Sequence, residues 1–190
     1  MGFLDAILGR KQLKEAAPDR LFALSTAQVT LEVELGLRSA GAAAVCFKPL
    51  SAEHFARAQR DLAELLDVTA RDSGSEVEHR SDELGFEWVV VRDPHLEDLV
   101  TTVHLVSSEL IARGFGPQLL AAMFRFEGRD EDAPVYLLYA YKRGTFYPFI
   151  RTGKDTRDNA RELELKAKLE GELPIEQDLS RWFGIYDAPI

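Results

Sequence analysis

The sequence predicts an α+β fold, an antiparallel sheet of about five to six strands with helices packed on one face. Three observations support this prediction. Several apolar runs alternate with period two and are joined by short turns, which favours antiparallel neighbours. One long amphipathic helical pattern lies between these runs. A chain of 190 residues, 46% of them apolar, is long enough to bury a core of its own.

Residues 1–17 are expected to form an amphipathic segment and a linker, and residues 18–190 a single domain. The apolar residues of the segment share one face of a short helix from Met1 to Gly9: Phe3, Leu4, Ile7 and Leu8. The polar stretch Arg10–Pro18 is typical of a linker. Because so short a helix is unstable alone, it should dock on the domain, on a membrane surface or on a partner helix.

The first part of the domain is expected to alternate helix and strand. Ser25 and Gln28 have capping-box spacing, which predicts a helix ending at Gly36, although residues 29–35 also alternate like a strand. A buried strand is expected at Ala42–Lys48. A helix capped by Ser51 should follow, with the apolar positions Phe55, Ala58, Leu62, Leu65 and Leu66.

The middle of the chain predicts a hairpin and the longest helix. Strands are expected at Val77–Arg80 and Leu84–Arg92, with Trp88 and Val90 facing one side and Val89 and Val91 the other. Asp93 and Pro94 then begin a helix that Gly114 ends. Its core stripe comprises Leu96, Leu99, Val100, Val103, Ser107, Leu110 and Ile111.

The last part predicts three further strands, at Leu119–Phe126, Val135–Lys142 and Thr145–Ile150. A charged helix should run from about Asp155 to Glu170. The apolar residues of the C-terminal tail must either dock on the domain or form an exposed apolar patch: Leu179, Trp182, Phe183, Ile185 and Tyr186.

No motif of catalysis, metal binding or phosphate binding is recognisable, so we expect no catalytic residues, metal or cofactor. The four histidines lack metal-ligand spacing, and His104 is more typical of a structural histidine than of a general base. Cys46 lies in an apolar run and is expected to be a buried, inert thiol. Asp82 and Glu83 are expected to be solvated loop charges. A single cysteine and no recognisable signal peptide favour the cytoplasm.

The chain has a net charge of −9, and this negative charge disfavours nucleic-acid binding. The charges are unevenly distributed along the sequence. The segment from Lys142 to Arg161 contains six basic residues and only two acidic ones, and three aromatic residues are interleaved with them. We take this segment as a candidate contact surface, with a solvated face as the alternative. Its members are Lys142, Arg143, Phe146, Tyr147, Arg151, Lys154, Arg157 and Arg161. Replacing Arg143, Lys154 and Arg157 by glutamate should cost little stability.

Several segments together resemble the PspA-associated PspAB family of the phage-shock, envelope-stress system. The most specific are Tyr141–Phe149 and Asp178–Phe183. The others are Met1–Asp5, Leu8–Arg10, Leu21–Leu24, Thr30–Glu32, Val45–Phe47, Gly85–Trp88 and Gly114–Leu120.

The resemblance implies a non-enzymatic adaptor or regulator that contacts PspA, at the inner face of the membrane, with an HtpX-type membrane protease as another associated protein. It carries over no catalytic residues. The second hypothesis is an enzyme or small-ligand-binding domain whose site is assembled from distant residues, with His104, Arg143 and Tyr147 as its candidate members.

Overall fold

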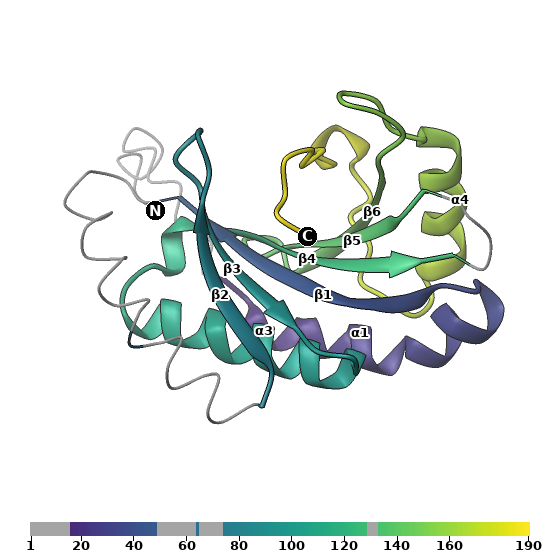
Figure 1. Cartoon of the computed structure of the whole chain (residues 1–190). Helices are drawn as coiled ribbons and strands as arrows, with labels where there is room; N and C mark the ends of the chain where they lie inside the picture. The colour runs from purple at the N-terminus through teal and green to yellow at the C-terminus, as the bar shows by residue number, and fades with distance from the viewer. Residues whose placement is uncertain (1–15, 49–63, 65–73, 129–132) are drawn as a thin grey trace, which may run out of the picture.

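The centre of the fold is a six-stranded sheet in the spatial order β2-β3-β1-β4-β5-β6, with every neighbouring pair antiparallel. The computed structural model describes residues 16–48, 64, 74–128 and 133–190. The predicted α+β class is therefore confirmed (Figure 1). The strands are β1 (Arg38–Phe47), β2 (Glu76–Ser81), β3 (Glu87–Arg92), β4 (Leu119–Glu127), β5 (Val135–Ala140) and β6 (Thr145–Ile150).

A helical stretch precedes the sheet, as predicted, so the alternative of a strand at residues 29–35 is wrong. It comprises η1 (Pro18–Phe22), α1 (Ala23–Thr26) and the π-helical η2 (Thr30–Glu34). The predicted capping box is also wrong, because helical structure begins before Ser25, whose hydroxyl has no hydrogen-bond partner within the described part of the chain. Gly36 ends the stretch with a φ of +67°, a left-handed conformation that glycine adopts without strain.

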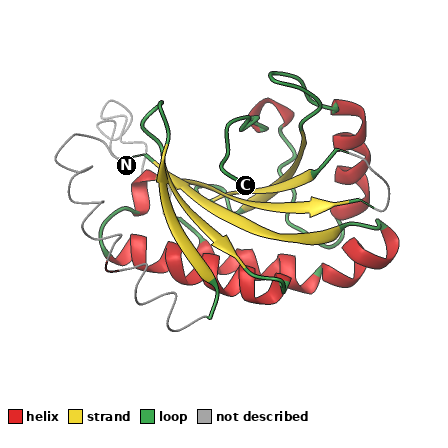
Figure 2. Ribbon diagram, in the orientation of Figure 1, coloured by secondary structure: helices red, strands yellow, loops and turns green. Residues whose placement is uncertain are grey.

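The long helix is α3 (Leu96–Ala112), which begins two residues after the predicted start. The Asp93 carboxylate accepts hydrogen bonds from the His95 N–H at 2.9 Å and from the Ser75 hydroxyl at 2.8 Å, so it lies just before the helix. The apolar stripe of α3 is buried, except that Ile111 is only half-buried. Figure 2 shows α3 and α1 together covering one face of the sheet.

The last helix, α4 (Asn159–Leu169), packs beside the edge strand β6. It begins later than predicted because residues 151–157 form a turn, closed by a bridge between Arg151 and Arg157. The Asp158 side chain caps it by accepting from the Arg161 N–H at 3.0 Å. The N-terminal amphipathic helix and the helix predicted after Ser51 lie outside the described residues.

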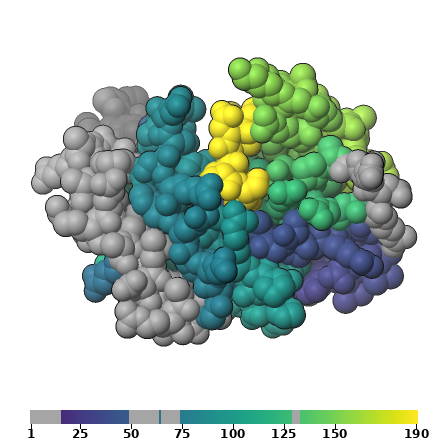
Figure 3. Space-filling view, in the orientation of Figure 1, coloured from purple at the N-terminus to yellow at the C-terminus, as the bar shows by residue number. Residues whose placement is uncertain are grey.

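The opposite face of the sheet carries the C-terminal tail. Trp88 and Val90 pack on this face with Ala44 and Cys46, whereas Val89 and Val91 join the core beneath the helices, as their alternation predicts. Tail residues, among them Ile185 and Ile190, pack against the first group. Figures 1 and 3 show the tail lying over the sheet between the β2–β3 hairpin and α4.

Within the described part of the chain, no helix has the length and apolar character needed to cross a membrane.

Candidate functional site: a cavity between the sheet and the C-terminal tail

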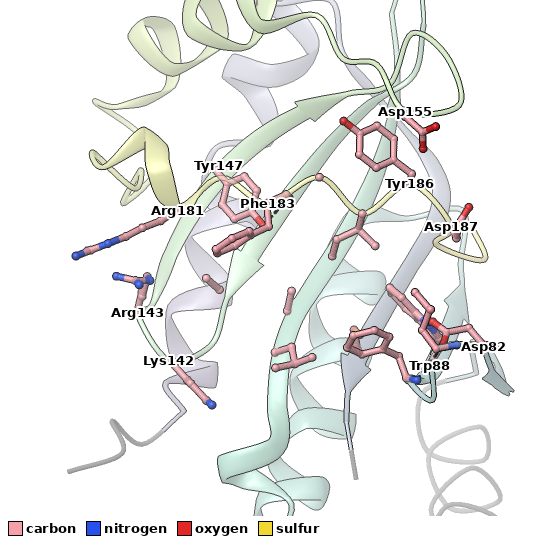
Figure 4. Close-up of a pocket in the computed structure, with 18 residues that line it drawn as sticks. Asp82, Trp88, Lys142, Arg143, Tyr147, Asp155, Arg181, Phe183, Tyr186 and Asp187 are labelled. Carbon is pink, nitrogen blue, oxygen red and sulfur yellow. Dashed lines mark hydrogen bonds between the residues drawn. The ribbon is translucent and has the colours of Figure 1, made fainter. Parts of the chain in front are cut away.

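A cavity of about 990 Å³ lies between the sheet and the C-terminal tail (Figure 4). Its floor is a row of small side chains on three adjacent strands. In the strand register Cys46 of β1 lies opposite Ala121 of β4, and Ala121 lies opposite Ala140 of β5. The row ends at Trp88, which pairs with Cys46 on the other side. Small side chains next to a large one leave a hollow that the tail does not fill.

The walls of the cavity are mainly apolar and aromatic. Leu84 and Phe86 come from the β2–β3 turn, and Leu120 from the start of β4. The remaining wall residues are Tyr147 of β6 and four tail residues: Phe183, Gly184, Ile185 and Tyr186. The cavity is thus built from segments that are far apart in the sequence, at an apolar interface of the kind that ligand sites occupy.

Side-chain hydrogen bonds to main-chain carbonyls hold the tail above the floor. Arg157 Nη1 donates to the Trp182 carbonyl at 2.8 Å, and the Tyr147 hydroxyl donates to the Phe183 carbonyl at 3.1 Å. Arg151 Nη1 donates to the carbonyl of Tyr186. These bonds fix the backbone of the tail and leave its side chains free to shape the cavity.

Aromatic contacts add to this attachment. The Trp182 ring stacks on Tyr147 with centroids 5.9 Å apart, and the Tyr186 ring meets Phe149 edge-on at 5.2 Å. The two partner rings lie two residues apart on β6, on the same face of the strand. Burial raises the pKa of Tyr147, so its hydroxyl remains a hydrogen-bond donor at neutral pH.

Three cations form one end of the cavity, called here the cationic end: Lys142, Arg143 and Arg181. The first two lie in the turn between β5 and β6, which Gly144 completes with a φ of +67°. There an added Cβ would lie 2.8 Å from the flexible end of the Arg20 side chain, which can move aside, so the turn needs glycine for its left-handed conformation. Arg181 comes from the tail and lies beside them (Figure 4).

The charges of the cationic end are only partly balanced. The buried Glu176 lies 3.6 Å from Arg143 and 3.8 Å from Arg181, and Asp178 lies 2.8 Å from Arg181. Lys142 has no carboxylate partner among the described residues. The cationic end therefore keeps about one uncompensated positive charge next to an apolar cavity.

Three carboxylates lie around the other side, called here the acidic end: Asp82, Asp155 and Asp187. Asp82 is not the solvated loop charge that the sequence suggested. Its Oδ1 accepts from the N–H groups of Leu84 and Phe86, and its Oδ2 accepts from Trp88 Nε1, each at 2.9 Å. This carboxylate shapes the β2–β3 turn and fixes the indole in the wall.

The predicted basic and aromatic segment is divided by the structure. Its turn residues Lys142 and Arg143 line the cavity together with Tyr147. Phe146 is fully buried in the core beneath the other face of the sheet, so its ring is not part of any accessible surface. Lys154 is exposed and Arg161 is half-buried, and neither lines the cavity.

The two remaining arginines of that segment serve the architecture. Arg151 and Arg157 both hold the tail, and Arg157 also pairs with the buried Glu162 at 2.7 Å. The expectation that Arg157 could be replaced by glutamate at little cost is therefore wrong, because the change would leave two buried carboxylates together. The four N-terminal candidates, Phe3, Leu4, Ile7 and Leu8, lie outside the described residues.

The residues of the enzyme hypothesis are not brought together. Arg143 and Tyr147 line the cavity, but His104 lies on α3 at the opposite face of the sheet. Its Nε2 is 2.9 Å from the Asp19 carboxylate and its ring packs on Phe22, as expected for a structural histidine. Among the described residues, no group of three or more histidine, cysteine or acidic side chains could hold a metal ion.

Cys46 forms part of the cavity floor, although it is buried. Burial raises the pKa of its thiol to about 12, and the carboxylates of Asp82 and Glu87 act in the same direction. The thiol is thus protonated at neutral pH, as expected for an inert cysteine.

Sequence reasoning missed the tail residues of the site, above all Arg181. The tail was expected either to dock on the domain or to form an exposed apolar patch, and nothing in its pattern showed where it would dock. The alanines of the floor carried a usable signal, since Ala121 and Ala140 share one face of their strands with the larger residues Met123 and Leu138. A small residue at such a position leaves room on the face of the sheet.

Comparison with known proteins agrees with the resemblance seen in the sequence. A family model described as PspA associated protein B matches residues 1–190, the whole chain. No curated protein and no solved structure matches the chain significantly.

Proposed function

Because the chain belongs to the PspA associated protein B family, we propose that it is a non-enzymatic adaptor or regulator that works by direct contact with PspA. The family description itself states an association with PspA. The adaptor role, the direct contact and a position at the cytoplasmic face of the membrane are our proposal. An HtpX-type membrane protease is a further candidate partner.

The observation that carries the proposal is a set of exposed apolar side chains around the cavity that holds the cationic end. Leu84, Leu120 and Phe183 are 66%, 36% and 67% exposed, and all three line the same cavity. Exposed apolar side chains next to cations are typical of contact surfaces, because burial supplies affinity and charge speeds association. The surrounding chain carries a net charge of −9, so this local positive field is distinctive.

The contact surface is smaller than the sequence suggested. Arg151 and Arg157 hold the tail, so the charge available to a partner comes from Lys142, Arg143, Lys154 and Arg181. The second proposed contact, the N-terminal segment with Phe3, Leu4, Ile7 and Leu8, rests on the sequence pattern alone.

The test is binding of the full chain to purified PspA at low and at high salt. In the variant Lys142→Glu/Lys154→Glu both replaced side chains are without an ion pair among the described residues, so the fold should be retained. We expect its association with PspA to fall at least tenfold, mainly through a slower on-rate, and wild-type binding to weaken with salt. The matched control is Arg38→Glu, a reversal of charge at the start of β1, away from the cavity.

The outcomes separate the partners. Equal binding of wild type and the double variant at both salt concentrations would show that these charges are only solvated, and would overturn the proposal. Binding to anionic phospholipid vesicles without binding to PspA would also overturn it, in favour of a membrane surface. Loss in the double variant with retention in Arg38→Glu would support it.

The second hypothesis, a small-ligand-binding domain, gains support from one feature. The cavity has a volume near the upper end of the ~300–1,000 Å³ typical of ligand sites, with a few polar groups around an apolar interior. A contact with PspA at the rim of the cavity does not explain why the protein keeps a large apolar interior beneath it.

A further inference from the structure

The interior of the cavity combines an apolar floor with one cationic end. From this combination we propose that the chain binds a single-chain amphipathic monoanion, such as a fatty-acid carboxylate, with the head group at the cationic end and the alkyl chain along the floor. This site is distinct in kind from the proposed contact with PspA, because the ligand is small and lies beneath the tail.

The floor fits an alkyl chain by shape. Cys46, Ala121 and Ala140 form a continuous row across three strands, which gives an alkyl chain an apolar path across the sheet. Trp88 closes one end of the row. None of the three short side chains presents a strong hydrogen-bonding group to the interior, since the thiol of Cys46 is protonated and only a weak donor. Such a floor gains free energy from apolar surface and does not require a polar partner.

The charge at the cationic end sets the number of charges on the ligand. Glu176 and Asp178 offset two of the three cations there, and Lys142 remains without a carboxylate partner among the described residues. One anionic group on the ligand completes the balance. A dianion would be left with an uncompensated charge beside apolar walls, which is unfavourable.

The acidic end sets the direction of the ligand. Asp155 and Asp187 are exposed carboxylates at the rim, and they repel an anionic head group. The oxygens of Asp82 already accept three hydrogen bonds from the turn and from Trp88. The head group therefore lies at the cationic end, and the far end of the alkyl chain points toward Trp88.

The test is titration of the purified full chain with dodecanoate below its critical micelle concentration, without PspA. Binding is followed by calorimetry and by the tryptophan fluorescence of the unmodified chain. We expect saturable binding of one equivalent. Dodecanol, which has the same chain but no charge, should bind at least tenfold more weakly, and dodecyltrimethylammonium should not compete.

Two kinds of variant locate the site. Lys142→Glu should weaken dodecanoate binding at least tenfold, whereas Lys154→Glu, the same charge reversal outside the cavity, should leave it unchanged. Ala121→Leu fills the floor and should abolish binding. Because Ala121 is buried and its variant could misfold, Ala140→Leu at the half-exposed end of the floor provides a second test. Ala167→Leu, on the exposed side of α4, adds the same bulk elsewhere and serves as its control.

Several results would overturn the inference: no saturable binding of dodecanoate, equal affinity for dodecanol, or undiminished binding by a folded Ala140→Leu variant. An anionic head group could belong to a free single-chain ligand or to a lipid in a membrane. Co-sedimentation with phosphatidylglycerol vesicles distinguishes these two sources. Binding to the vesicles without binding of free dodecanoate would mean that the cationic end recognises a membrane surface, and the single-chain ligand would be wrong. Because PspA is absent from these titrations, their failure leaves the proposed contact with PspA standing.

Discussion

Arg157 and Trp182 are joined by a hydrogen bond of 2.8 Å from the guanidinium to the main-chain carbonyl, across 25 positions of the sequence. The same guanidinium pairs with the buried Glu162 of α4 and lies over the Phe149 ring at 5.1 Å. One side chain thus connects α4, β6 and the tail. The wall of the cavity depends on this connection, because the wall residues of the tail, Phe183 to Tyr186, follow Trp182 directly.

Arg157→Gln should lower the free energy of unfolding by about 3–5 kcal/mol, because it leaves the Glu162 carboxylate buried without its cation. Glu162 also accepts from the Ile150 N–H at 2.8 Å, so it cannot turn to solvent without breaking a second bond. The measurement is urea denaturation followed by circular dichroism. The double variant Arg157→Gln/Glu162→Gln is the control and should lose less than the single variant. A larger loss in the double variant would contradict the assignment.

Asp82→Ala should cost about 1–3 kcal/mol, because two turn N–H groups and the Trp88 indole lose their acceptor. The same denaturation experiment measures the loss. The tryptophan emission of the folded variant should change in parallel, since the Trp88 indole loses its partner. Glu83→Ala, in the same turn, is the matched control. Equal stability of the two variants would show that Asp82 is a solvated charge after all.

The Cys46 thiol should resist alkylation by iodoacetamide in the folded protein up to about pH 9 and react fully in urea. The pKa of this thiol is raised from 9.0 to about 12 by burial, so the unfolded chain releases the proton first as the pH rises. Its contribution to stability is therefore complete below pH 9 and is lost as the pH rises toward 12.

The matched control for this pH dependence is Cys46→Ala, which should lose less stability than the wild type over the same pH interval. Rapid alkylation of the native wild type at pH 8 would contradict the buried, protonated thiol.

Ser107→Ala should destabilise the core by about 1–3 kcal/mol, because the buried Tyr141 hydroxyl loses the hydroxyl that it contacts on α3. Burial raises the pKa of Tyr141, so its proton stays in place and still needs a partner. Adding Tyr141→Phe removes the orphaned hydroxyl and should recover part of the loss in thermal unfolding. A further drop of the same size in the double variant would rule out the pairing.

The sequence predicted the elements well where local periodicity decides the structure. The stripe of α3 and the alternation around Trp88 follow from the neighbours of each residue along the chain. Boundaries were less accurate because they depend on side chains elsewhere. β3 begins at Glu87 rather than Leu84 because Asp82 binds the N–H groups of that turn.

The cavity could not be predicted, because it depends on register across four strands and on where the tail docks. Lys142, Arg143 and Tyr147 were candidates in the sequence, but their charge and aromatic character alone do not show that they face a hollow. From the sequence, Arg157 was assigned to the contact surface. An arginine that links two structural elements cannot be distinguished by sequence from an arginine exposed to solvent. The partner of such an arginine is fixed only by tertiary structure.

Hydrogen–deuterium exchange of the full chain with and without PspA tests most directly the claim that the sheet face beneath the tail is the functional surface. We predict slower exchange on binding in residues 82–88, 140–147 and 181–187, and unchanged exchange in α3 on the opposite face. Slowing confined to α3 and α1, or no slowing in any of the three cavity segments while PspA is bound, would contradict it.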